Sequence, residues 1–153
     1  MNHASPPSSY AELESYLPYL INRLASLGQA TQTRMLQKDS INLVTLRALS
    51  ILQIEDGLTI NEVAERTFTE QSSTSRAIEA MVLQGLVERR VPEQDQRRRE
   101  IVLTSKGRKQ LHQIWPAMDG YFEMLSEGTS AAERDICRNV LARMLTNLNK
   151  LTG

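Results

Sequence analysis

The stretch that decides the fold runs from residue 69 to residue 104 and reads TEQSSTSRAIEAMVLQGLVERRVPEQDQRRREIVLT. Its first half places apolar residues at the three- and four-residue spacing of a helix with one buried face. These residues are Ala77, Ile78, Met81, Val82 and Leu83. The pattern predicts a helix from Glu70 to about Gln84, with Thr69 as its N-cap and Gly85 at its end.

The second half of the stretch changes from a helical pattern to a strand pattern. Residues 86–91 and 99–104 form two short segments rich in β-branched side chains, and a polar segment that contains Pro92 separates them. This arrangement predicts a β-hairpin with a long exposed loop, of the kind called a wing.

Upstream of this stretch, two capping boxes mark the starts of helices. A hydroxyl residue is followed three residues later by glutamate at Ser9 and at Thr59. The first box predicts one long helix from about Ser9 into the thirties, in which Pro18 is a possible kink. Asp39 or Ser40 is expected to cap a second helix, and Thr59 opens a short third one.

Downstream of the wing, Thr104 is expected to cap a fifth helix that bends at Pro116, and a third capping box at Ser130 opens the last helix. The predicted fold class is mainly α with a small β-wing, with six helices and a two- to three-stranded wing hairpin. Such a chain is a winged helix-turn-helix protein. Residues 39–104 would form the winged domain, residues 10–38 and 105–153 a helical dimerisation region, and residues 1–9 a disordered tail.

The first and last predicted helices carry apolar stripes too broad for a small wing domain to cover. In the last helix, one row holds Ile136, Val140 and Met144, and a second row holds Cys137 and Leu141. Stripes of this width favour a symmetric dimer built from both chain ends. The alternative is a monomeric bundle in which the two stripes cover each other.

The composition indicates a globular protein of a reducing compartment. The hydrophobic fraction of 41% is enough for a core, and no apolar run approaches the ~18 residues of a membrane span. The first nine residues lack the basic start and the apolar stretch of a signal peptide. A single cysteine cannot form an internal disulfide, so we expect a cytoplasmic protein.

The charge is balanced over the chain but not along it. Eighteen basic residues cancel eighteen acidic ones, yet residues 71–110 hold nine bases and five acids, and residues 41–70 hold two bases and five acids. A basic segment on a near-neutral chain is typical of DNA binding confined to one face. The start of the predicted helix at residues 69–76 adds small hydroxyls, an amide and an arginine, which suit a recognition helix in a major groove.

Two parts of the sequence resemble the MarR family of transcriptional regulators. Residues 73–89 are similar to the recognition helix of that family running into its first wing strand. Residues 95–107 are similar to its wing signature, an Asp-x-Arg followed by an apolar-x-Leu-Thr-x-x-Gly. The order of the six predicted helices also matches, so the resemblance covers nearly the whole chain after about residue 10. It implies a homodimer that binds a pseudo-palindromic operator in double-stranded DNA, and most often a repressor that responds to a small ligand.

The resemblance also assigns DNA-binding residues by position. In the family, the wing arginine enters the minor groove and the aspartate two residues earlier holds its side chain; here these are Arg97 and Asp95. A narrow minor groove concentrates negative potential, which favours a guanidinium there. Arg98 and Arg99 are expected to contact phosphates or to pair with Glu100. The residues expected to face the major groove and its phosphates are Gln71, Ser72, Ser73, Ser75 and Arg76.

Other residues of the same helix have different expected roles. Thr74, Ala77 and Ile78 are expected to pack against the protein. Glu70 would be repelled by phosphate, yet a carboxylate is favourable at a helix N-terminus and can accept a hydrogen bond from a cytosine amine, so its role stays open.

The resemblance implies a controlling signal, which in this family is commonly an aromatic acid or a phenol and in some members an oxidant or a metal. Cys137 lies in the last helix, whereas oxidant-sensing members use a cysteine near the start of the first, so we expect it to be a small buried apolar residue. His3 and His112 are too few for a metal site, and no cofactor is expected. A small-molecule cleft remains, which could be lined by Tyr16, Tyr19, Arg23, Arg47, His112 and Trp115.

The predicted function is therefore that of a sequence-specific DNA-binding transcriptional regulator. The alternative is a winged-helix dimer that recognises a protein instead of DNA, which the modest excess of basic residues and Glu70 favour. An enzyme is not expected, because the sequence contains no Cys-His pair, Gly-rich phosphate loop or nucleophile motif.

Overall fold

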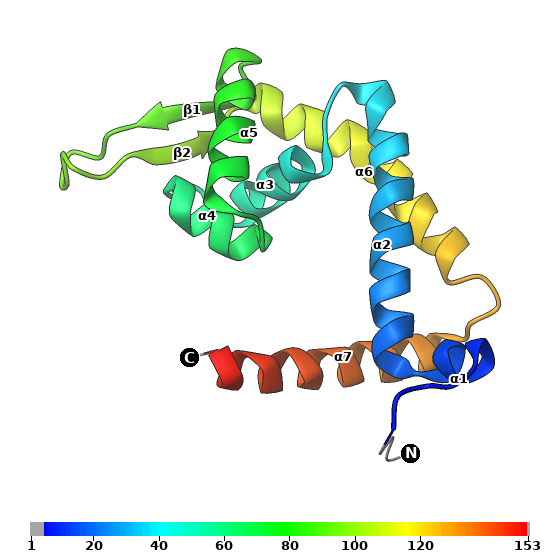
Figure 1. Ribbon diagram of the computed structural model, residues 1–153. Coiled ribbons are helices and arrows are strands. Elements are labelled where there is room, and N and C mark those ends of the chain that lie inside the picture. Colours follow the sequence, from blue (N-terminus) through cyan, green and yellow to red (C-terminus); the bar gives the residue numbers. More distant parts are fainter. Residues whose placement is uncertain (1–4, 153) are drawn as a thin grey trace. The chain divides into compact units, whose positions relative to one another are not determined.

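The computed structural model describes residues 5–152. The expectations for His3 and for the first four residues of the tail therefore lie outside the described residues. The described residues form seven α-helices, one 3-10 helix and one two-stranded antiparallel sheet (Figure 1). The chain divides into two compact units, one ending at Pro116 and the other beginning at Ala117. Among the described residues, no helix combines the length and the hydropathy needed to cross a membrane.

The first unit begins with two helices, α1 (Tyr10–Ser15) and α2 (Leu17–Leu36), where one long helix was predicted. The start is as predicted, because the Ser9 hydroxyl accepts the N–H of Glu12 at 3.2 Å. The prediction of a single helix is wrong at Tyr16, which is extended with a ψ of 112°. Pro18 explains the break, since it has no N–H to donate to the preceding turn and its ring clashes with that turn.

Three helices follow and form the helix-turn-helix region: α3 (Leu43–Ile54), α4 (Ile60–Thr67) and α5 (Gln71–Leu83). A 3-10 helix, η1 (Gln37–Asp39), precedes them. The predicted N-cap of the second helix is wrong: Asn42 caps α3, and its Oδ1 accepts the N–H of Thr45 at 2.8 Å. The capping box on α4 is confirmed, since Thr59 and Glu62 exchange both of its hydrogen bonds.

The wing is a hairpin of β1 (Val87–Arg90) and β2 (Glu100–Leu103), in which Val87 lies opposite Leu103 and Arg90 opposite Glu100. Leu58 adds a single bridge to Ile101, so a third strand is reduced to one residue pair. Figure 1 shows the hairpin loop extending beyond the helices α3–α5. The predicted wing is confirmed, with each strand one residue shorter at each end.

Helix α6 (Ser105–Leu125) starts directly after the wing. The Thr104 hydroxyl accepts the N–H of Gly107 at 3.0 Å, as expected of its cap, and donates to the Leu86 carbonyl at 2.9 Å. A Cβ on Gly107 would collide with that carbonyl, so only glycine allows the helix to approach the hairpin this closely. Pro116, expected to bend α6, lies inside it and does not end it.

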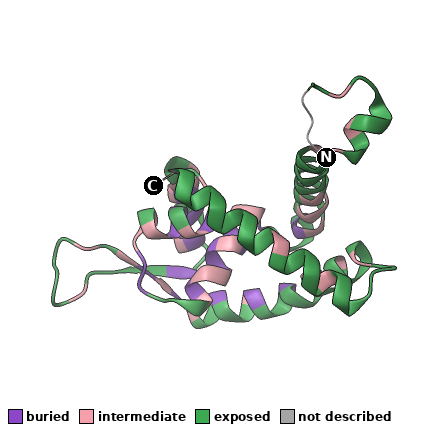
Figure 2. Ribbon diagram, turned by 90° about the horizontal axis from the view of Figure 1, so that it is seen from below, coloured by how far each residue is buried: buried purple, intermediate pink, exposed green. Residues whose placement is uncertain are grey.

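The core of the first unit lies where α3, α4, α5 and the base of the hairpin meet. Leu49, Val63, Ile78 and Met81 are fully buried, and Ile101 from β2 is 1% exposed. Figure 2 shows the buried segments gathered where these elements meet. It also shows that the hairpin loop is exposed. Of the residues predicted for the apolar face of α5, Ala77, Ile78 and Met81 are buried and anchor the helix. The prediction is wrong for Leu83 at the end of the helix, which is 89% exposed.

The second unit contains the end of α6 and helix α7 (Ala131–Thr152). The predicted capping box opens α7: the N–H of Ser130 donates to the Glu133 carboxylate at 2.8 Å, and the N–H of Glu133 donates to the Ser130 hydroxyl at 3.3 Å. The apolar rows of α7 are exposed in the single chain, with Ile136 at 63% and Leu145 at 57%. Cys137, expected to be buried, is also exposed in the single chain.

Candidate nucleic-acid interface

Helix α5 presents a polar edge at its N-terminal end. Gln71, Ser72 and Arg76 are exposed, and Ser73 and Ser75 are half-buried. On the opposite side, Thr74, Ala77 and Ile78 are buried, which confirms their packing role. The N–H groups of a first helical turn have no partner inside the helix, so this edge also offers backbone donors to an anion such as phosphate.

The turn before α5 differs from the prediction. Glu70, not Thr69, holds the N-cap position, and its exposed side chain makes no capping hydrogen bond. The Thr69 hydroxyl instead donates to the Thr67 carbonyl at 3.2 Å. Phe68 adopts a left-handed φ of 51° and is 88% exposed, although glycine is the usual residue at such a helix end.

The other end of α5 connects it tightly to the wing. Gly85 has a φ of 69°, and the N–H groups of Gly85 and Leu86 bond back to the carbonyls of Val82 and Met81. This is the Schellman arrangement, which glycine favours because it has no Cβ. The ammonium of Lys106 donates to the Gln84 carbonyl at 2.6 Å. The predicted end of the helix at Gly85 is thus confirmed.

The tip of the wing is ordered by Asp95. Its Oδ1 accepts the backbone N–H of Arg97 at 2.9 Å, and its carbonyl accepts the N–H of Arg98 at 3.1 Å. Arg97 is exposed, and its guanidinium forms no ion pair or hydrogen bond with any residue in the described part of the chain. Asp95 therefore holds the backbone at Arg97, whereas the resemblance implied that it holds the side chain.

The neighbouring arginines are directed differently. Nη1 of Arg99 donates to the carbonyls of Gln96 at 2.6 Å and Arg98 at 3.1 Å, and its side chain stays on the surface. Arg98 points back to the base of the wing, where its Nε donates to Glu100 at 3.2 Å. Of the roles expected for these two residues, pairing with Glu100 is confirmed for Arg98.

The carboxylates at the base of the wing are held in the charged state. A backbone hydrogen bond from Thr59, its hydroxyl and the nearby Arg98 lower the pKa of Glu62. A hydrogen bond from Arg90 has the largest effect in lowering the pKa of Glu100, and Arg98 adds to it. Both residues are therefore expected to be ionised at neutral pH.

The basic residues of the segment 71–110 fall into two groups. Three of them pair with carboxylates, namely Arg89 with Glu79, Arg90 with Glu100, and Arg98 with Glu62 and Glu100. The other six have no carboxylate partner among residues 5–152. They are Arg76, Arg97, Arg99, Lys106, Arg108 and Lys109. The uncompensated positive charge thus belongs to the start of α5, the wing loop and the start of α6.

A hollow of about 510 Å³ lies beside the start of α5. Residues from α2, α3 and the turn before α5 line it, including Gln29, Arg47, Phe68, Glu70 and Ser73. It combines polar and apolar groups and reaches two residues at the start of α5. Of the residues suggested for an effector cleft, Arg47 is the one that lines this hollow.

A second hollow of about 330 Å³ lies between the end of α3 and α6, and His112 and Trp115 line it. Arg23, also suggested for a cleft, pairs with Glu14 at 3.2 Å, and its guanidinium lies 6.0 Å from the ring centre of Tyr19. In the described part of the chain, no group of three or more histidine, cysteine or carboxylate residues could hold a metal ion.

The model of the MarR family matches residues 40–98, from the end of η1 to the wing loop. The crystal structure of a MarR family transcriptional regulator from Silicibacter pomeroyi is 32% identical and has a TM-score of 0.86, and the match covers 96% of this chain and 99% of that chain. The chain belongs to the MarR family of transcriptional regulators.

Less similar proteins also match. The transcriptional repressor MprA of Escherichia coli is 23% identical over 142 residues, which are 89% of this chain and 81% of MprA. A match to the HTH-type transcriptional regulator YdgJ of Bacillus subtilis, 24% identical, spans 65% of that protein. The structure of Bordetella bronchiseptica BpsR, studied for the regulation of its DNA binding by 6-hydroxynicotinic acid, has a TM-score of 0.78 at 19% identity and covers 91% of this chain and 97% of that chain. At that identity, the likeness to BpsR shows the fold alone.

Sequence reasoning missed two contacts that place the MarR wing. Oδ1 of Asp56, before the turn into α4, accepts the N–H of Leu103 in β2 at 2.8 Å. Glu62 of α4 binds Arg98 of the wing at 2.8 Å. Both contacts join residues more than thirty positions apart. The sequence carried no local signal for either one, beyond the identity of Glu62 as a capping residue.

Proposed function

We propose that this MarR family protein is a sequence-specific DNA-binding transcriptional regulator that acts as a repressor. The observation that carries the proposal is the polar N-terminal edge of α5 together with the guanidinium of Arg97, which has no partner among the described residues; both lie in the same compact unit. Basic residues without a carboxylate partner among residues 5–152 lie on α5, on the wing loop and at the start of α6, which favours the phosphate backbone as a partner. The repressor MprA, among the relatives, supports the direction of regulation.

In this proposal, α5 enters a major groove and the wing loop reaches the flanking minor groove. Gln71, Ser72, Ser73, Ser75 and Arg76 face base edges and phosphates, and short polar side chains of this kind let the helix come close to the bases. Arg97 enters the minor groove, with Asp95 ordering the loop and Arg99 beside the phosphates. Residues 39–104 are the DNA-binding domain.

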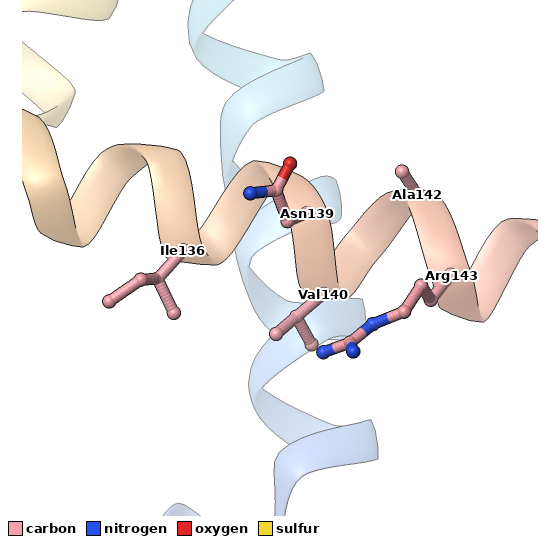
Figure 3. A pocket seen from close by; sticks show the side chains of 5 residues that line it. All are labelled: Ile136, Asn139, Val140, Ala142 and Arg143. Carbon is pink, nitrogen blue, oxygen red and sulfur yellow. The ribbon is translucent and has the colours of Figure 1, made fainter.

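The protein is proposed to act as a homodimer through residues 10–38 and 105–153. Leu24 and Leu27 of α2 are more than half exposed, as is Leu145 of α7, and such apolar side chains gain free energy when a second copy covers them. Figure 3 shows Ile136 and Val140 on one side of α7, with Asn139 and Ala142 on the other. Two-fold symmetry would set the half-sites of a pseudo-palindromic operator about 10 base pairs apart.

An effector is proposed to bind the hollow between α2, α3 and the start of α5. Half-buried Arg47 pairs with no carboxylate in the described part of the chain, so it can receive the carboxylate of an aromatic acid. Phe68 and Val44 supply apolar surface for a ring. Because Glu70 and Ser73 also line this hollow, an occupant would touch the start of the recognition helix directly. BpsR, a protein of the same fold whose DNA binding is regulated by 6-hydroxynicotinic acid, is an example of such control.

The test of the proposed function is selection of duplexes from random-sequence DNA by the full-length protein, followed by footprinting on the selected site. Protection of two half-sites, and of the DNA flanking its own gene, is expected. A steep fall of affinity with salt would separate DNA binding from the alternative of a protein-binding module. As a partner of DNA, the protein would work in the cytoplasm, and regulation rather than catalysis would be its activity.

A further inference from the structure

Arg98 lies between two surface arginines in the sequence, but its guanidinium is directed into the protein. Nη2 donates to Oε2 of Glu62 at 2.8 Å and to the Gly57 carbonyl at 3.3 Å. Nε donates to Oε1 of Glu100 at 3.2 Å. The Arg98 side chain is 35% exposed, and that of Glu100 is 13% exposed. Nε and Nη2 of this arginine thus donate to groups of the protein itself.

Glu62 is itself fixed at the N-terminus of α4. The same Oε2 that binds Arg98 accepts the backbone N–H of Thr59 at 2.7 Å and the Thr59 hydroxyl at 2.8 Å. A single carboxylate oxygen therefore closes the cap of a helix-turn-helix element and holds a residue of the wing. The two residues are 36 positions apart in the chain.

Glu100 completes the cluster from the strand β2. Its Oε2 accepts two hydrogen bonds from Arg90 of the opposite strand, at 2.8 Å and 3.1 Å, while its Oε1 is left for Arg98. Two arginines and two glutamates share their charges in this cluster. It therefore adds no net positive charge to the face that we propose binds DNA.

We infer that Arg98 is a positioning residue for the wing and not a phosphate contact. Its bonds to Glu62 and Glu100 tie the base of the hairpin to the N-terminus of α4, and this directs the adjacent Arg97 outward from a fixed base. A residue already bound by three groups loses these partners if it turns to a phosphate. Arg97 and Arg99, in contrast, have no carboxylate partner among residues 5–152 that such a turn would break. The inference rests on the proposed function of DNA binding.

The dependence of DNA affinity on salt separates the two roles. Removal of one phosphate contact lowers the slope of log affinity against log salt concentration by about 0.9, because one counterion fewer is released. Removal of a positioning residue weakens binding at every salt concentration and leaves the slope unchanged. Glu62→Gln separates them further, because glutamine keeps an acceptor for Thr59 and removes the charge that holds Arg98. If Arg98 binds phosphate, freeing it from Glu62 leaves DNA affinity unchanged or raises it.

The experiment measures the affinity of the full-length protein for an operator duplex selected by the wild type, between about 50 and 200 mM salt. Arg98→Ala and Glu62→Gln are each expected to weaken binding about fivefold or more with an unchanged slope, and the double variant no more than Arg98→Ala alone. Arg99→Ala is the control, because it removes the same charge from the neighbouring residue. A slope reduced by about one in Arg98→Ala, with no loss in Glu62→Gln, would overturn the inference.

A second measurement needs no DNA. Amide hydrogen exchange of residues 94–99 is expected to quicken in Arg98→Ala and in Glu62→Gln but not in Arg99→Ala, because only the first two release the base of the hairpin. Exchange that stays at the wild-type rate in Arg98→Ala would also overturn the inference. If the wild-type protein selects no duplex, the proposed function fails, and the exchange measurement still decides the role of Arg98.

Discussion

Oδ1 of Asp95 lies 2.9 Å from the backbone nitrogen of Arg97 and accepts its N–H. Aspartate side chains often form such a turn with the backbone two residues ahead. Here the turn bends the wing loop, and Arg97 lies exposed on it. The Arg97 guanidinium is left without a partner among the described residues. The aspartate of the Asp-x-Arg motif therefore prepares the backbone for the arginine and leaves its charge available.

Arg97→Ala is expected to weaken operator binding strongly, by about 1–3 kcal/mol or roughly 5- to 150-fold, because the variant loses a base-edge contact in a groove of negative potential. A mobility-shift titration measures the loss, and circular dichroism checks that the fold is kept. Arg97→Lys retains the charge without the planar guanidinium, so its DNA affinity should lie between those of the wild type and Arg97→Ala. Near wild-type affinity of the alanine variant would exclude the proposed role of the wing.

Asp95→Ala and Asp95→Asn distinguish a hydrogen bond from a charge effect. Asparagine keeps an oxygen that can accept the N–H of Arg97, so Asp95→Asn should bind DNA at least as well as the wild type. Asp95→Ala loses the acceptor, and we expect a decrease of about 0.5–1.5 kcal/mol in DNA binding. The same titration compares the two variants, and equal losses in both would show that the carboxylate charge, not the turn, is what matters.

Gly107→Ala should destabilise the protein. Its Cβ would collide with the Leu86 carbonyl and come within 2.8 Å of the Leu103 side chain, and overpacking of this kind costs about 1–3 kcal/mol. Gly120→Ala is the matched control in the same helix, since nothing lies within 4 Å of its Cβ. There, alanine should stabilise α6 by up to about 1 kcal/mol. Thermal unfolding of both variants tests the contrast, and a neutral Gly107→Ala would contradict the close approach.

Acidification should remove part of the folding stability through Glu62 and Glu100. The pKa of each carboxylate is lower in the folded state than its ordinary value of about 4.3, so each contributes stability above that pH. This contribution is lost as the pH falls through the lowered folded pKa. Urea unfolding between pH 7 and pH 3 should show a smaller loss for Glu62→Gln than for the wild type. A control, Glu93→Gln, removes a carboxylate of the wing loop and should change the profile less.

The apolar rows of α7 should be needed for dimerisation. Leu141→Lys combined with Leu145→Lys places two charges on a face that we propose is covered by the second copy, and a monomer is expected by light scattering. Asn139→Lys with Ala142→Lys is the control: it changes residues on the side of the helix away from Ile136 and Val140 and should leave the dimer intact (Figure 3). A wild-type protein that is monomeric at every concentration would contradict the dimer itself.

Local signals in the sequence were enough for most of the elements. The capping boxes at Thr59 and Ser130, the helix end at Gly85 and the hairpin between two β-branched segments are all present as predicted. Each depends on residues within a few positions of one another. The errors were local as well. The chain breaks at Tyr16, beside Pro18, where one continuous helix was predicted. Asn42 caps α3 in place of Asp39 or Ser40, because several neighbouring polar residues could have served and the sequence does not rank them.

The sequence by itself determined the family, the order of the elements and the candidate DNA-binding residues, since these follow from short-range periodicity and from the two MarR-like motifs. Tertiary structure alone decided how the three consecutive arginines differ. Glu62 and Glu100 come together around Arg98 only after the wing folds onto α4, and this leaves Arg97 and Arg99 without a carboxylate partner among the described residues. The physical reason is that an ion pair depends on distance in space, and its partners here are up to 36 residues apart in the chain.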